Sequence, residues 1–159
     1  MGVGGRLGRR GERDERSRIV ILYCNYEETS ALRSGARVFL ERSSDDPRPV
    51  AAPPEAHDRV AALLPRLSGD FTVDTLADLR SIEAAVDPIV VLLRAEMEML
   101  VAATHAADEQ AVAAYFDFAH SYSVLARVRE LIGEMEAMIE LATGGPVTAQ
   151  LVREFVFPD

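Results

Sequence analysis

The sequence lacks several features that would assign it to a known class of catalyst. Its 159 residues contain no lysine, so all 17 basic side chains are arginine. Cys24 is the single cysteine, which excludes an intrachain disulfide framework and a Cys-x-x-Cys metal or redox motif. No serine lies in a Gly-x-Ser-x-Gly turn, and the glycines at positions 2, 4 and 5 precede neither a strand nor a lysine. These absences argue against the serine nucleophile of an α/β-hydrolase and against a glycine-rich loop that binds nucleotide phosphates.

Long hydrophobic segments are also missing. The first 18 residues lack the apolar core of a secretory signal. The apolar run from Ile89 to Leu93 ends at Arg94 and is far too short to span a bilayer. Together with the lone cysteine, these features predict a reducing, cytoplasmic location and no membrane partner.

Charge divides the chain into two unequal parts. The net charge is −9, but residues 1–18 hold six arginines against three acidic residues, a net of +3. The rest of the chain therefore carries −12, and such an acidic body repels phosphate backbones. We expect residues 1–17 to be a disordered basic head and residues 18–159 to be a single helical domain. We expect no nucleic-acid binding except through residues 1–17.

The N-terminal half predicts one strand and two helices. After Arg18, an apolar run that begins with three β-branched residues extends to Cys24, and it predicts a strand from Arg18 to Cys24. Asn25 followed by Glu28 resembles a capping box and predicts a helix over residues 26–42. Gly35 lies in the middle of that helix and costs about 1 kcal/mol against alanine unless close packing uses its missing side chain. Residues 43–54 contain four prolines and predict a loop, and residues 55–67 predict a short helix.

Residues 74–104 carry a helical apolar pattern that continues in phase across Asp87-Pro88. Proline fits the first turn of a helix, so a new helix could begin there. Because the apolar stripe does not change phase, we favour a single kinked or nearly collinear helix.

The most regular segment runs from Asp108 to Gly144. A single buried seam is predicted by its apolar positions, which only Ser121 interrupts: Ala111, Ala114, Phe118, Leu125, Val128, Ile132, Met135 and Ile139. Gly144 tolerates a left-handed cap, and Pro146 prevents continuation of the helix. After Pro146, Thr148 could cap a last short helix ahead of an apolar tail.

These elements predict a mainly α fold with a long C-terminal helical hairpin over residues 74–143, shorter N-terminal helices and one N-terminal strand. A helix over residues 108–143 is roughly 54 Å long, whereas a compact chain of this length has a radius of gyration of about 15 Å. One chain therefore cannot bury all the apolar side chains of the two long helices, and we predict a homodimer that forms a four-helix bundle. The predicted interface and core residues are Leu93, Met97, Leu100, Phe118, Leu125, Val128, Ile132 and Met135.

An inward-facing metal site is the main enzymatic alternative. Ferritin-like centres use carboxylates with a Glu-x-x-His pair, and the nearest counterpart is Asp117 with His120. Helical angles place His120 about 120° from the seam of its own helix. Glu98 and His105 lie about as far from the apolar stripe of residues 74–104, so a solvated polar face is favoured. Tyr122 is the residue to consider for a small-molecule ligand.

We assign no catalytic, cofactor-binding or metal-binding residues and no cofactor. The residues favour a non-enzymatic cytoplasmic interaction, scaffold or regulatory protein that acts as a homodimer with a partner of unknown identity. A helical-bundle enzyme or sensor that binds a metal or a small molecule is the alternative.

Overall fold

A computed structural model of the chain describes residues 20–42, 45–46, 52–68, 71–73, 75–103 and 108–145. These residues form two short strands, four α-helices and one 3-10 helix. The predicted basic head at residues 1–17, and the predicted helix and tail after Pro146, lie outside the described residues. The described part is mainly helical, as the apolar patterns predict.

The two strands form a small antiparallel sheet. Strand β1 (Val20–Leu22) pairs with β2 (Phe71–Val73), with Val20 opposite Val73 and Leu22 opposite Phe71. β1 lies within the predicted strand from Arg18 to Cys24, whereas β2 has no counterpart in the predictions. Three residues are too few to show an alternating pattern, and pairing with β1 fixes them instead.

The capping box predicted at the first helix is present. Helix α1 (Tyr26–Leu40) begins after Asn25, whose side-chain oxygen accepts a hydrogen bond from the Glu28 backbone N–H at 2.8 Å. Glu28 Oε2 accepts one in return from the Asn25 backbone N–H at 2.9 Å. Helix α2 (Ala56–Leu63) continues into the 3-10 helix η1 (Leu64–Arg66), which contains Pro65.

Helices α3 (Leu76–Ala103) and α4 (Glu109–Thr143) form the predicted hairpin. α3 is unbroken at Pro88, which confirms the single helix favoured from the phase of its stripe. α4 begins at Asp108, whose side chain accepts from the Gln110 N–H, and it ends at Gly144 in the left-handed region with φ 69°. The Gly144 N–H donates to the Glu140 carbonyl at 2.8 Å.

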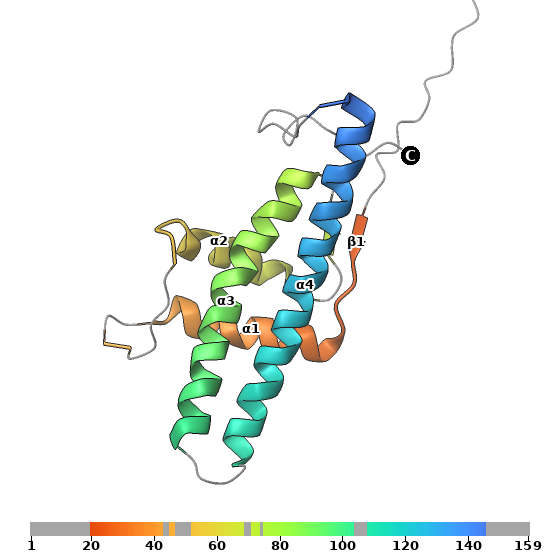
Figure 1. The fold of residues 1–159 in the computed structure, drawn as a ribbon. Coiled ribbons are helices and arrows are strands. Elements are labelled where there is room, and N and C mark those ends of the chain that lie inside the picture. The colour runs from red at the N-terminus through yellow and green to blue at the C-terminus, as the bar shows by residue number, and fades with distance from the viewer. Residues whose placement is uncertain are drawn as a thin grey trace, which may run out of the picture.

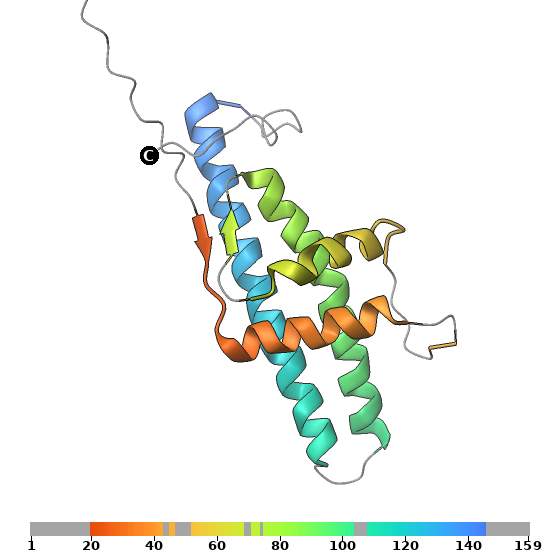
Figure 2. The ribbon, with the colours of Figure 1, turned by 180° about the vertical axis from the view of Figure 1, so that it is seen from behind.

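α1 and α2 lie against one face of the hairpin. α1 contacts both α3 and α4, and α2 contacts α3. Figure 1 views the hairpin from the face opposite α1, which we call the open face, and Figure 2 shows α1 and α2 in front of the hairpin from behind. α1 approaches α3 closely at Gly35, because a Cβ there would lie 2.6 Å from Ile89 Cγ2.

The α4 seam is covered within one chain. Leu125, Val128 and Ile139 are almost fully buried, and Ile132 and Met135 are less than one tenth exposed. α3 and α1 pack on α4 and supply this cover. The expectation that the seam needs a second chain is therefore wrong, because the length argument did not consider a helix lying across the hairpin. The dimeric four-helix bundle stays a prediction.

Candidate interaction surface

The eight predicted interface and core residues divide into two groups along the hairpin. Five are buried in the core: Leu93, Leu125, Val128, Ile132 and Met135. The other three, Met97, Leu100 and Phe118, are half-buried. These three lie between the α1 crossing at Ile89 and the loop that joins α3 to α4. The three half-buried positions therefore all lie in the outer half of the hairpin.

We define the free end of the hairpin as residues 91–103 of α3 and 108–122 of α4. In Figure 1 this end extends beyond α1. Seven large apolar side chains at this end are 37–56% exposed: Val91, Met99, Val101, Val112, Tyr115, Phe116 and Tyr122. Four of them, Val91, Val101, Tyr115 and Tyr122, share the open face, and exposed apolar side chains that gather on one face mark interaction sites in proteins.

Aromatic rings gather on α4 at the free end of the hairpin. The Phe118 and Tyr122 ring centroids lie 5.9 Å apart, and those of Tyr115 and Phe116 lie 5.7 Å apart with edge-on geometry. Phe116 also stacks on the His120 ring at 6.1 Å. Tyrosine and phenylalanine combine a large contact area with few rotatable bonds, which is why aromatic residues are enriched at protein interfaces.

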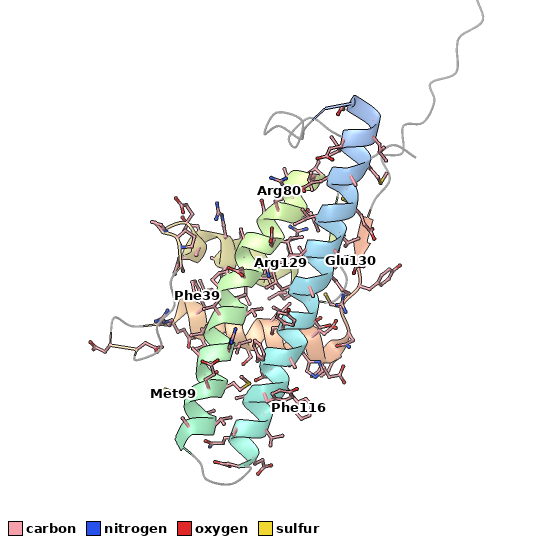
Figure 3. All side chains as sticks on the ribbon, in the orientation of Figure 1. Phe39, Arg80, Met99, Phe116, Arg129 and Glu130 are labelled. Atoms are coloured by element: carbon pink, nitrogen blue, oxygen red, sulfur yellow. The ribbon has the colours of Figure 1, made fainter. Side chains whose placement is uncertain are left out.

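Ion pairs occupy the other half of the open face. Arg129 of α4 donates to Glu83 at 3.1 Å and to Asp87 at 3.0 Å, both on α3. Arg80 of α3 pairs with Glu136 of α4. Figure 3 labels Arg80 and Arg129 on the two helices as seen from the open face. Such exposed pairs add little stability, but they show which turns of α3 lie beside which turns of α4.

The polar residues considered for a metal site do not gather. Among the described residues, no group of three or more His, Cys, Asp or Glu side chains could hold a metal ion. Glu98 is exposed and pairs with Arg94 at 3.0 Å, as expected for a solvated face. Asp117 is half-buried, and loss of solvation raises its pKa although the His120 charge acts in the opposite direction. His105 lies outside the described residues.

The strongest buried polar contact joins Glu28 to Arg127. Arg127 Nη1 donates to Glu28 Oε1 at 2.8 Å, and Nη2 donates to Oε2 at 2.6 Å. Glu28 is 4% exposed. The hydrogen bond from Arg127 lowers the pKa of Glu28, burial opposes this shift, and the Asn25 N–H supports it. Sequence reasoning missed this pair because 99 residues separate the partners and no local signal connects them.

A surface hollow of about 300 Å³ adjoins this pair. Its walls come from β1, the residue after it, and α4, and they consist of Leu22, Tyr23, Arg127, Glu130, Leu131 and Glu134. Because Glu28 already takes both terminal nitrogens of Arg127, the guanidinium offers little to a ligand. The hollow is therefore a weaker candidate than the free end of the hairpin.

Within the described ranges, no helix has both the length and the apolar content needed to cross a bilayer. Comparisons with models of known protein families, with curated proteins and with solved structures find no significant match to this chain.

Proposed function

We propose that this protein is a non-enzymatic helical interaction protein, a scaffold, adaptor or regulatory subunit, that acts as a homodimer. One observation carries the proposal: the free end of the hairpin exposes seven large apolar side chains, four of them on the open face. Burial of one such side chain contributes roughly 1.5–3 kcal/mol. A surface with this many favours association over exposure.

The geometry favours a partner made of helices. A two-helix layer with one face covered by α1 and α2 and the other face open can bury its open face by packing against a second two-helix layer. Four-helix bundles have this arrangement. Two-fold symmetric dimers are also the commonest oligomers of soluble proteins.

Size-exclusion chromatography with light scattering tests the homodimer. We expect a mass twice that of the 17.4 kDa chain at micromolar concentration. A monomer across the micromolar range would contradict the homodimer.

A sensor or enzyme that binds a metal or small molecule is the second candidate. Its support is Asp117, whose pKa is raised by burial one helical turn from His120 and beside the aromatic cluster. Elemental analysis of the purified protein separates the two proposals. Stoichiometric iron, manganese or zinc that is lost from an Asp117→Asn variant would favour the second candidate.

A further inference from the structure

The α3 side of the free end carries a palindromic set of exposed side chains. Val91, Arg94, Glu98 and Val101 follow one another at intervals of three, four and three residues, so they form one stripe along the helix. Arg94 and Glu98 are 65% and 59% exposed, and the two valines are 37% and 56% exposed. Residue 96 is the midpoint both of the two charges and of the two valines.

The α4 side carries a second symmetric set. Tyr115 and Tyr122 form a symmetric pair seven residues apart and are 53% and 52% exposed, and Phe118 lies between them. Tyr115 and Tyr122 precede Arg129 at seven-residue intervals, which places them on the open face with Arg129. The midpoint of the two tyrosines falls between residues 118 and 119, beside the Phe118 ring.

The ion pairs show that the two midpoints lie side by side. Arg129 bonds both Glu83 and Asp87, so it lies opposite residue 85 of α3. α3 and α4 are antiparallel, so the same number of residues can be counted towards the loop on each helix. Eleven residues from 129 on α4 is residue 118, and eleven residues from 85 on α3 is residue 96, so residues 118 and 96 also lie opposite one another. One axis across the hairpin therefore passes through the centres of both sets.

We propose that a second copy of this chain docks on the open face at the free end, related by a two-fold axis that crosses the hairpin at residues 96 and 118. This inference rests on the proposed homodimer and specifies its interface. The axis places α3 antiparallel to α3 of the second copy. Arg94 then lies opposite Glu98 of the second copy, Val91 opposite Val101, and Tyr115 opposite Tyr122, all in one arrangement.

Charge complementarity identifies the occupant as a second copy. Each chain carries a net charge of −9, so two copies repel one another except where opposite charges face one another. The antiparallel arrangement sets an arginine against a glutamate at two symmetry-related positions, whereas parallel alignment of the two α3 helices would set like charges together. A partner of another sequence would not require palindromes on both helices with a shared centre.

Charge-reversal variants test this arrangement by mixing. Arg94→Glu alone places a carboxylate opposite Glu98 of the second copy, and Glu98→Arg alone places a guanidinium opposite Arg94. We expect each variant to dissociate at a concentration about tenfold higher than the wild type. An equimolar mixture of the two variants restores both attractive pairs and forms heterodimers. Sedimentation or light scattering with one variant carrying a mass tag measures them.

The outcomes separate this inference from the proposed function. Recovery of the dimer on mixing supports the antiparallel interface, because a defect in the folding of either variant is not repaired by the other. A Leu141→Ser control, at an 86% exposed residue near the far end of α4, leaves the dimer unchanged. A wild-type dimer that both charge variants retain overturns the interface and leaves the homodimer standing. A monomeric wild type overturns the homodimer itself.

Discussion

Glu28 shows how one buried carboxylate can join local and long-range structure. It closes the capping box at the start of α1 through the Asn25 N–H, and it takes two hydrogen bonds from Arg127 on α4. Removal of one partner of a buried ion pair leaves the other desolvated without compensation. Arg127 is 37% exposed, so water reduces part of that cost.

We therefore expect Glu28→Gln to lower the free energy of unfolding by roughly 1–3 kcal/mol. Urea unfolding followed by circular dichroism measures the change. Glu130→Gln, at an exposed position on α4, is the matched control and leaves stability within about 0.5 kcal/mol. Equal effects of the two substitutions would show that the Glu28–Arg127 pair adds nothing.

The pH dependence of stability follows from the same pair. The pKa of Glu28 is lower in the folded protein than its ordinary value of 4.5. The stabilising contribution is therefore complete above about pH 4.5 and is lost as pH falls through the folded pKa. We expect the difference in unfolding free energy between wild type and Glu28→Gln to shrink as pH falls below 4.5. A difference that stays constant down to pH 3 would contradict this assignment.

Ser121 is the one polar interruption of the α4 seam. It is fully buried, and its hydroxyl has no hydrogen-bond partner among the described residues. A buried hydroxyl without a partner costs free energy that an alanine does not. We expect Ser121→Ala to raise the unfolding free energy by about 1 kcal/mol in urea titrations. A loss of stability would mean that the hydroxyl finds a partner, such as bound water.

At the scale of the helices, two glycines with equal propensity have opposite roles. At Gly35 in α1, an added Cβ would lie 2.6 Å from Ile89 Cγ2 and 3.0 Å from Leu93 Cδ1. At Gly133 in α4, an added Cβ would meet nothing within 4 Å. The first glycine allows α1 to approach α3, whereas the second only weakens its own helix.

We expect Gly35→Ala to destabilise the protein by roughly 1–3 kcal/mol, because the overlap exceeds the gain in helix propensity. Gly133→Ala is expected to stabilise it by about 0.5–1 kcal/mol. Thermal melts of both variants give the comparison. If both alanines stabilise, then α1 does not approach α3 as closely as the structure shows.

Local signals at the helices are strong enough to predict them from sequence. The Asn25–Glu28 cap, the Gly144 terminus and the phase across Pro88 each act within a few residues, so their patterns survive in the sequence. β2 and the Glu28–Arg127 pair depend on partners far away along the chain, so no short sequence pattern predicts them. For the candidate surface, the sequence indicates Met97, Leu100 and Phe118, but burial alone separates them from the five core positions.

At the scale of the whole molecule, the proposal of a dimer rests on the open face and not on the length of α4. α1 and α3 cover the seam from Leu125 to Ile139, so the length of α4 does not require a second chain. The open face at the free end retains exposed apolar residues that no described element covers. We therefore propose an interface on the neighbouring stripe of Tyr115 and Tyr122 and not on the seam.

A protein that dimerises through this face gains stability from its own concentration. We expect the melting temperature of the wild type to rise by a few degrees for each tenfold increase in protein concentration. Arg94→Glu is expected to flatten that slope without changing the melting temperature of the monomer by more than a small amount. Differential scanning fluorimetry over two decades of concentration measures both. A flat slope in the wild type would contradict self-association.

Arg129 has a consequence beyond the contacts it makes. Its bonds to Glu83 and Asp87 can form in only one lengthwise alignment of α3 with α4, and they therefore favour that alignment. Only in that alignment do the two palindromes share a centre of symmetry. In the proposed dimer Arg129 lies about three turns from the two-fold axis. We expect Arg129→Met to weaken dimerisation in light scattering although every residue of the proposed interface is unchanged.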